Sequence, residues 1–230
     1  MSYQWVALVP MRHTSERVPG KNYRQLAGRP LYAHILEALS QVQAIERIVV
    51  DTDSPVIQAG LAEDFPEVLV LDRPEALRGG DVPMNAVIRH DLEQVPSYFY
   101  VQTHSTNPLL RAETIERSIQ RFNENLPAID SLFSVTGWQT RLWTVDGVPI
   151  NHDPDQLLRT QDMEVVYQEN SCLYLFGRDT MLESGRRIGR SPLLFEIDRI
   201  EAIDIDNEAD FQLVKAVLDS FPNGFPRGMS

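Results

Sequence analysis

The sequence contains one cysteine, two lysines and no long apolar stretch. The single cysteine, Cys172, excludes a disulfide within the chain, and its place in the apolar run CLYLF predicts a small buried side chain rather than a nucleophile. No apolar run approaches the roughly 20 residues that a transmembrane helix needs. The N-terminus has neither a basic segment before its apolar run nor a small-residue cleavage site. We therefore expect a cytoplasmic protein with no membrane partner.

Positive charge is scarce overall but is concentrated near the N-terminus. The chain has 21 Lys and Arg against 33 Asp and Glu, a net charge of −12 at pH 7. That balance argues against the broad basic surface of a non-specific nucleic-acid binder. Within residues 1–29, one acidic residue accompanies five basic ones: Glu16, and Arg12, Arg17, Lys21, Arg24 and Arg29. Such a cluster fits either a site for a small anion or a solvated arginine-rich loop, and charge alone does not choose between them.

Two common nucleotide-binding motifs are absent. The sequence contains neither GxxxxGK[ST] nor GxGxxG, which excludes a P-loop and a dinucleotide fingerprint. Residues 9–22, VPMRHTSERVPGKN, nevertheless follow a predicted buried strand directly. Arg12 offers a planar fork of donors for phosphate oxygens, Lys21 adds a compact charge, and the backbone around Thr14 can cradle an anion. This stretch predicts a phosphate-binding loop of another type.

Strand-like and helix-like segments alternate along the chain. Strands are predicted at 5–9, 47–52, 67–72, 98–103, 131–137, 172–176 and 200–206. Helices are predicted at 30–42, from Pro55 with Ser54 as cap, and at 84–95, 112–125, 178–185 and 207–218. This order predicts one α/β domain over 1–230, with a mainly parallel sheet flanked by helices. Ligands collect at the carboxyl ends of such strands, which predicts one edge formed by the loops 10–22, 51–55, 72–85 and 102–108.

The alternation of strand-like and helix-like segments stops at 137–170. This segment is aromatic, polar and interrupted by proline, and a hairpin is predicted at Asp146–Gly147. We interpret this segment as an insertion that covers a site or contacts a partner subunit. The tail, 222–230, is expected to be frayed.

Two carboxylates near the end of the chain predict a metal site. If 200–206 is a strand, Asp204 and Asp206 lie on the same face, about 7 Å apart. That spacing suits a Mg²⁺ ion that keeps most of its waters and also binds substrate phosphates. The alternative is two solvated carboxylates, one of them capping the next helix. Asp210 is expected to be a first-turn acid that favours the helix dipole.

A series of motifs in this sequence resembles those of the sugar-activating cytidylyltransferases, in the same order. VPMRHTSERVPGKN is similar to their opening P-A-R-x-x-S-x-x-x-P-x-K-N, and VVDTDSPVI, TNPLL, RTQD, YQENSCLYLF and IDIDNEADF match later motifs. The resemblance covers about residues 4–218 and is closest to the acylneuraminate (sialic acid) cytidylyltransferases. It implies a Rossmann-like fold of the nucleotide-diphospho-sugar transferase type. Synthetases for Kdo share S-x-R-[LV]-P-G-K, but here Asn22 follows Lys21 where they have Pro.

The resemblance implies a Mg²⁺-dependent transfer of CMP from CTP to the anomeric hydroxyl of a sialic-acid-like, nine-carbon α-keto acid sugar, with release of pyrophosphate. It implies catalytic roles for Arg12, Lys21 and Asp206. The nucleotide would be bound by Arg12, Ser15, Lys21, Asn22 and Arg73, the last near the cytosine. The metal would be held by Asp204 and Asp206. The side chains of Gln102, Arg159 and Asn170 would face the sugar, and Arg159 would pair with its carboxylate. Segment 137–170 would be the contact of a homodimer and would help complete the partner's sugar site.

Departures from the family pattern cluster on the acceptor side. The stretch QTHSTNPLL is two residues longer than the family's Q-P-T-S-P-L, and Cys172 stands where Gly is usual. His104, which has no family counterpart, is either a sugar contact or a solvated loop residue. We therefore expect cytidylyl transfer to an acceptor that need not be N-acetylneuraminate. The alternatives are a different acceptor such as Kdo, another base or a sugar 1-phosphate, and a non-catalytic relative that binds a nucleotide sugar.

Overall fold

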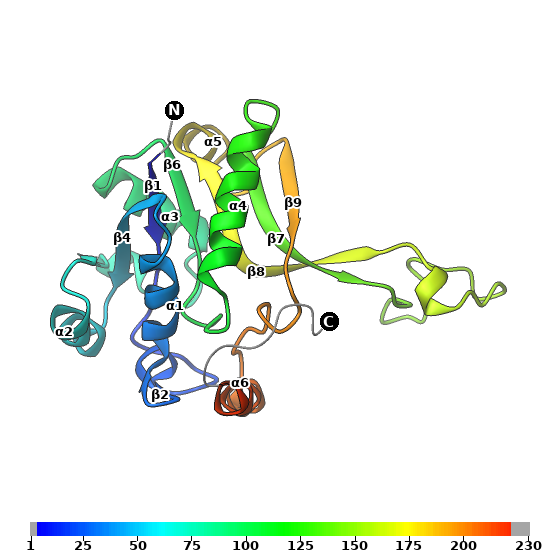
Figure 1. The fold of residues 1–230 in the computed structure, drawn as a ribbon, viewed down its shortest axis with the longest axis horizontal. Coiled ribbons are helices and arrows are strands. Elements are labelled where there is room, and N and C mark those ends of the chain that lie inside the picture. The colour runs from blue at the N-terminus through cyan, green and yellow to red at the C-terminus, as the bar shows by residue number, and fades with distance from the viewer. Residues whose placement is uncertain (1–3, 222–230) are drawn as a thin grey trace.

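The computed structural model describes residues 4–221, and the tail predicted to be frayed, 222–230, lies outside this range. Its centre is a seven-stranded sheet with the strand order β5-β4-β1-β6-β8-β7-β9 (Figure 1). The strands of this sheet are β1 (Trp5–Leu8), β4 (Ile45–Thr52), β5 (Leu69–Asp72), β6 (Phe99–Gln102), β7 (Ser131–Trp138), β8 (Val166–Gly177) and β9 (Pro192–Glu196). A separate two-stranded ribbon pairs β2 (Gln25–Leu26) with β3 (Arg29–Pro30).

The sheet is mixed but mostly parallel, as the alternation of strands and helices predicts. Strand β1 is parallel to β4 and β6, β4 is parallel to β5, and β7 is parallel to β9. Strand β8 alone runs antiparallel to its neighbours, β6 and β7. Because β7 and β8 are consecutive strands of one long hairpin, β8 must return in the opposite direction.

Helices cover both faces of the sheet. They are α1 (Leu31–Ser40), α2 (Pro55–Asp64), α3 (Met84–Gln94), α4 (Ala112–Asn125), α5 (Arg178–Ser184) and α6 (Glu208–Ser220). Apolar side chains of α1, α2 and α4 pack in one core with β1, and those of α3 and α5 pack in a second core on the other face. The predicted cap of α2 is confirmed, because Ser54 Oγ accepts from the backbone N–H of Ile57 at 3.3 Å.

The prediction of a strand at 200–206 is wrong. The last strand is β9, and residues 203–206 form an irregular segment that leads into α6. Ile203 and Ile205 alternate as in a strand, but they pack in a small third core under α6. The segment makes one backbone contact with the neighbouring loop, from Ile205 N to Thr106 O at 2.9 Å. The alternation therefore reflects burial of a single extended segment and not pairing within the sheet.

Segment 137–170 forms an arm that projects away from the sheet (Figure 1). Strands β7 and β8 continue into it, and β8 begins at Val166, six residues before the predicted start. The predicted hairpin turn is confirmed: Gly147 has a φ of +77° and donates its N–H to Thr144 O at 3.0 Å. The arm exposes large apolar side chains, including Val145, Ile150 and Leu157.

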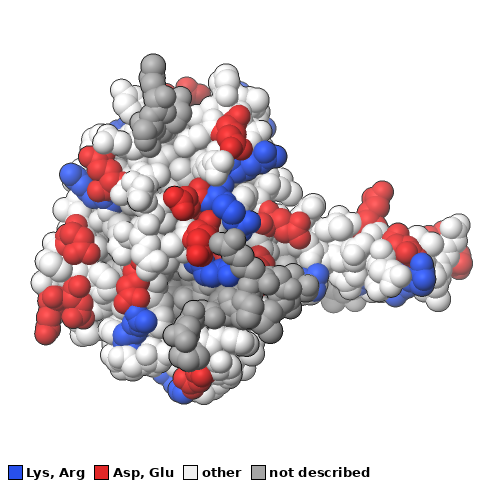
Figure 2. All heavy atoms as spheres, in the orientation of Figure 1, with Lys and Arg blue, Asp and Glu red and all other residues white. Residues whose placement is uncertain are grey.

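None of the helices within residues 4–221 is both long enough and apolar enough to cross a membrane. On the face shown in Figure 2, basic side chains lie in small groups beside acidic ones.

Candidate active site

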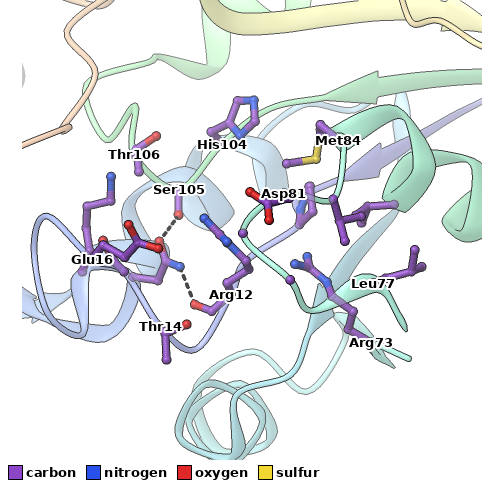
Figure 3. A pocket seen from close by; sticks show the side chains of 18 of the residues that line it. Arg12, Thr14, Glu16, Arg73, Leu77, Asp81, Met84, His104, Ser105 and Thr106 are labelled. Carbon is purple, nitrogen blue, oxygen red and sulfur yellow. Dashed lines mark hydrogen bonds between the residues drawn. The ribbon is translucent and has the colours of Figure 1, made fainter. Parts of the chain in front are cut away.

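A polar cavity of about 500 Å³ opens at the carboxyl end of the parallel strands (Figure 3). It is lined by residues of three loops, within 10–22, 73–87 and 104–106. The loops after β1, β5 and β6 therefore meet at one edge, as predicted from the alternation of strands and helices. In Figure 3, Arg12 and Arg73 point into this cavity from different loops.

Backbone N–H groups of the loop 10–22 bind it to the carboxyl end of β4 and the loop that follows. Met11 N donates to Asp51 O at 2.9 Å, and His13 N donates to Asp53 Oδ1 at 2.7 Å. Gly20 adopts a φ of +64°, and a Cβ there would lie 2.8 Å from the Tyr23 ring, so this turn requires glycine. The loop is thus held in shape before any ligand binds.

Asn22, one of the predicted nucleotide-binding residues, is buried and holds the loop to its neighbour. Its Nδ2 donates to Arg12 O at 2.7 Å, and its Oδ1 accepts from Ser105 Oγ at 2.8 Å. The amide therefore fixes the backbone that carries Arg12. Ser15 lines the cavity beside it.

Two of the predicted phosphate-binding cations lie on the cavity wall. Arg12 is exposed to the cavity, whereas the side chain of Lys21 is only 12% exposed. Lys21 Nζ donates to Ile205 O at 2.5 Å and lies 3.9 Å from Asp206 Oδ1. Burial lowers the pKa of Lys21, and the charges of Asp204 and Asp206 oppose that shift. These contacts tie the N-terminal loop to the acidic pair near the end of the chain.

The two predicted metal ligands lie on the same side of Lys21, although no strand positions them. Asp204 is partly buried; its Oδ1 is buried and has no hydrogen-bond partner within residues 4–221, and burial raises its pKa. Asp206 is half-exposed and pairs with Arg17 at 2.9 Å. An unpartnered buried carboxylate oxygen beside a second carboxylate is the donor chemistry that Mg²⁺ prefers, so these residues fit such an ion.

Asp210 has the structural role that the sequence predicts. Its Oδ2 accepts from the backbone N–H groups of Asp206 and Asn207 at 2.9 and 3.0 Å. Together with the Asn207 side chain it forms a capping box at the start of α6. This cap fixes the backbone of Asp206.

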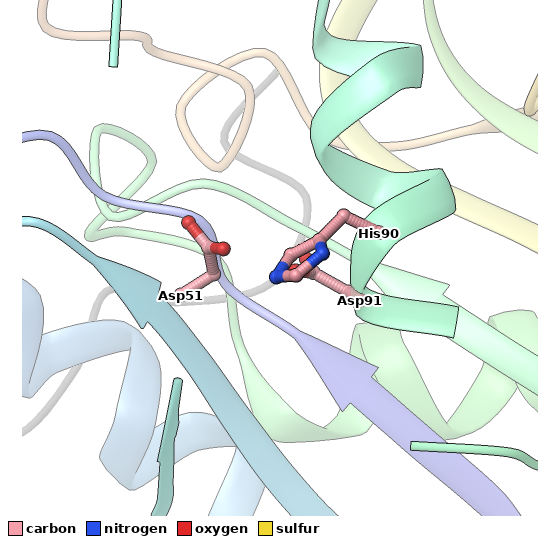
Figure 4. A group of neighbouring side chains, drawn as sticks. All are labelled: Asp51, His90 and Asp91. Atoms are coloured by element: carbon pink, nitrogen blue, oxygen red, sulfur yellow. The ribbon is translucent and has the colours of Figure 1, made fainter. Parts of the chain in front are cut away.

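A second acidic group lies behind the cavity and was not predicted. Asp51 at the end of β4 faces His90 and Asp91 of α3 (Figure 4). One ligand atom from each residue lies within 4.8 Å of the others, so the three could hold a metal ion. However, Asp51 is already ion-paired with the buried Arg73, whose Nη2 also donates to Asp51 O at 3.1 Å. Arg73 therefore lines the cavity as predicted, with its guanidinium held from behind.

The charge on this group is balanced by a proton. Asp91 is 1% exposed, and neither of its carboxyl oxygens accepts a hydrogen bond from a donor within the described residues. Burial, and next the charge of Asp51, raise the pKa of Asp91 to about 9. A protonated Asp91 donates to Asp51, which is also the ion-pair partner of Arg73, so Asp91 is not buried as an unpaired charge.

On the acceptor side, Gln102 is buried at the end of β6. Its Nε2 donates to Thr103 O at 2.9 Å and to His104 Nε2 at 3.0 Å, and its Oε1 accepts from Arg187. Burial, followed by the charges of Arg187 and Lys21, lowers the pKa of His104 to about 3, so the ring is neutral. His104 is half-buried and lies in the cavity wall, and its role as a sugar contact stays a prediction.

None of the three predicted sugar-binding residues, Gln102, Asn170 and Arg159, lines this cavity; Gln102 lies behind His104, which does. Asn170 is bound to β7, with its Oδ1 accepting from Ser134 Oγ at 2.6 Å and its Nδ2 donating to Thr136 Oγ1 at 3.0 Å. Arg159 is on the arm, where its side chain is 73% exposed and pairs with Asp162 at 2.7 Å. Their roles in sugar binding stay predictions.

Sequence reasoning missed Asp51, Asp91 and Arg187, because each of them depends on a contact between segments far apart in the chain. No local motif marks such contacts. The expectation for Cys172 is confirmed, since the thiol is fully buried and burial raises its pKa.

Comparison with known proteins identifies the family. The family model described as "Cytidylyltransferase" matches residues 6–219. The chain belongs to this family. The cytidylyltransferase is 27% identical to the CMP-N,N'-diacetyllegionaminic acid synthase of Legionella pneumophila, over 93% of this chain and 96% of that protein. It is 24% identical to the N-acylneuraminate cytidylyltransferase of Escherichia coli O18:K1:H7, over 90% of this chain but only 50% of that longer protein.

Solved structures support the same fold for the cytidylyltransferase. A CMP:2-keto-3-deoxy-manno-octonic acid synthetase in complex with CTP superposes with a TM-score of 0.70, over 94% of this chain and 99% of that one, at 15% identity. A 4-diphosphocytidyl-2C-methyl-D-erythritol synthase gives a TM-score of 0.67 at 15% identity, over 94% of this chain and 100% of that one. At this identity the likeness concerns the fold. The resemblance drawn from the motifs is thus confirmed at the level of the family.

Proposed function

We propose that this cytidylyltransferase transfers CMP from CTP to the anomeric hydroxyl of a nine-carbon α-keto acid sugar and releases pyrophosphate. The observation that carries the proposal is the cavity lined by two cations, Arg12 and Lys21, the second of which lies 3.9 Å from Asp206 and within the influence of the charge of Asp204. The names of relatives that act on legionaminic and acylneuraminic acids support an acid sugar as the acceptor.

The nucleotide is assigned to the loop 10–22 and to Arg73. Arg12 and Lys21 bind phosphate oxygens and offset the charge that develops when the α-phosphate is attacked. Ser15 adds a hydroxyl on the same wall, and Asn22 keeps the loop in shape. Arg73 contacts the cytosine from the far side of the cavity, with Asp51 fixing the direction of its guanidinium.

Asp204 and Asp206 are assigned to Mg²⁺. When bound, the ion supplies Lewis-acid polarisation of the α-phosphate. Asp206, which is half-exposed and close to Lys21, is also our candidate for the group that accepts the proton of the sugar hydroxyl. Lys21 holds this region together, because it also binds the carbonyl of Ile205, midway between the two carboxylates.

The sugar is assigned to Gln102 and Asn170, with Arg159 contributed by the arm of a second subunit in a homodimer. The exposed apolar side chains of the arm support such a contact, since surfaces of this kind mark interfaces.

The test is pyrophosphate release by the purified protein with Mg²⁺, each of the four nucleoside triphosphates, and a panel of N-acetylneuraminate, legionaminate, pseudaminate and Kdo. The proposal predicts turnover with CTP and a nine-carbon acid. Turnover with Kdo alone would favour the alternative acceptor. The double variant Asp204→Ala/Asp206→Ala should lose turnover, whereas Asp64→Ala, an exposed aspartate on α2, should keep it. Binding of CMP without turnover of any pair would favour a non-catalytic nucleotide-sugar binder.

A further inference from the structure

Arg187 lies just after α5 and is connected through Gln102 to His104, a residue of the cavity wall. Its guanidinium stacks on the Tyr174 ring, 3.9 Å from the ring centre, and donates to Gln102 Oε1. We propose that Arg187 binds the carboxylate of the acid acceptor from within the same subunit, and this proposal rests on the function proposed above. It adds an acceptor-binding residue that no motif in the sequence marks.

The charge of Arg187 has no counter-ion in the described part of the chain. Its one hydrogen bond there is to a neutral amide, and it forms none of the ion pairs within residues 4–221. The charge of Glu169 acts on Arg187, but its carboxylate accepts from the Tyr174 hydroxyl and forms no ion pair with Arg187 within residues 4–221. A partly buried cation is costly unless an anion pairs with it.

Two other arginines of this chain show how the fold compensates a guanidinium charge that lies away from solvent. Arg73 is ion-paired with the buried Asp51, and Arg111 is ion-paired with the buried Glu201. Each of these guanidinium groups is thus neutralised from within the protein. Arg187 has no such ion-pair partner within residues 4–221, so the anion that neutralises its guanidinium would have to belong to a bound ligand.

The position of Arg187 selects the acceptor's anion and not the nucleotide's phosphates. Gln102 links Arg187 to His104, which lines the same cavity as Arg12 and Lys21. His104 is thus close enough to both Arg187 and Lys21 for their charges to lower its pKa.

The chemistry of the group fits a carboxylate. Stacking on Tyr174 fixes the plane of the guanidinium, and most of its N–H groups remain available for a planar, bidentate partner. Arg159, which the family resemblance assigns to this carboxylate, is by contrast exposed on the arm and paired with Asp162.

The test compares the best acid acceptor of the panel with its methyl ester, in which an uncharged ester group replaces the carboxylate. The wild-type enzyme should prefer the acid, and Arg187→Gln should raise the KM for the acid by about 10- to 100-fold while leaving the KM for CTP unchanged. The variant should also lose most of the preference for acid over ester, which a merely structural role would not move. Arg186→Gln, at the exposed neighbouring residue, should behave as wild type.

Each outcome decides the proposal. An unchanged preference in Arg187→Gln, or its loss in Arg159→Gln instead, would overturn the assignment while the proposed function stands. Failure of the wild-type enzyme to turn over any acid sugar refutes the proposed function, and the assignment with it. If Arg187→Gln does not fold, Arg187→Lys serves with the same readout, because it keeps the charge but not the fork; a partial loss of preference is expected.

Discussion

The buried group formed by Asp51, Asp91 and Arg73 predicts a specific dependence of stability on pH. Asp91 has an ordinary pKa of 3.8, and burial beside Asp51 raises it to about 9 in the folded protein. Between these two values the folded state binds one proton more than the unfolded state. The free energy of unfolding therefore falls as the pH rises, and this contribution levels off above the folded-state pKa.

The size of the effect follows from the number of protons. One extra proton in the folded state corresponds to a slope of about 1.4 kcal/mol per pH unit, so the loss between pH 6 and pH 8 is about 3 kcal/mol. Asp91→Asn keeps an N–H donor toward Asp51 but cannot titrate. Between pH 6 and pH 8, the free energy of unfolding of Asp91→Asn should therefore fall by about 3 kcal/mol less than that of the wild type.

The assay is equilibrium urea unfolding of the wild type and Asp91→Asn at pH 6, 7 and 8, in buffers that contain EDTA. Asp64→Asn, at an exposed position on α2, controls for the loss of one carboxylate and should keep the wild-type slope. Equal slopes for the wild type and Asp91→Asn would refute the shared-proton account. So would a marked stabilisation of the wild type by Mn²⁺ or Zn²⁺, added in parallel titrations without EDTA, that Asp91→Asn lacks, since that result assigns the group to a cation.

Three further predictions concern single side chains. Glu201→Gln should lower the free energy of unfolding by about 3–5 kcal/mol in urea titrations, because it removes the buried partner of Arg111; a loss below about 1 kcal/mol would contradict the pairing. Lys21→Ala should reduce kcat/KM for CTP by at least about 100-fold in steady-state assays, since it removes a cation of the cavity wall that we propose binds the phosphates, and wild-type kinetics would exclude that role. Cys172 should resist iodoacetamide in the native protein and react only after unfolding, as followed by mass spectrometry; rapid native labelling would contradict its burial.

Much of the architecture could be predicted from local pattern. The helix predicted at 112–125 is α4 to the residue, because its apolar positions recur with helical spacing and its ends are polar. The loops that line the cavity follow from the rule on carboxyl ends of strands. These features depend on residues close together in the chain.

Other features depend on tertiary contacts and could not be predicted. Residues 200–206 have the period of a strand, but whether an extended segment joins a sheet depends on tertiary packing, and here Ile203 and Ile205 pack in the core under α6 while β9 takes the position beside β7. Likewise, the partners of Asp51 and Arg187 come from helices and loops that local pattern does not bring together. Asp204 and Asp206 lie near Lys21 although the strand predicted at 200–206 does not form. The cap of α6 and the Lys21–Ile205 hydrogen bond fix the segment that carries both carboxylates.

The central claim is that the acceptor's anomeric hydroxyl attacks the α-phosphate of CTP. The most direct measurement uses an acceptor sugar whose anomeric oxygen carries ¹⁸O, with mass spectrometry of both products. Attack by this hydroxyl predicts that the label stays in the CMP-sugar, in the bridge to phosphorus, and that pyrophosphate carries none. A CMP-sugar without the label would show that the sugar's carbon–oxygen bond breaks instead, and would contradict the account.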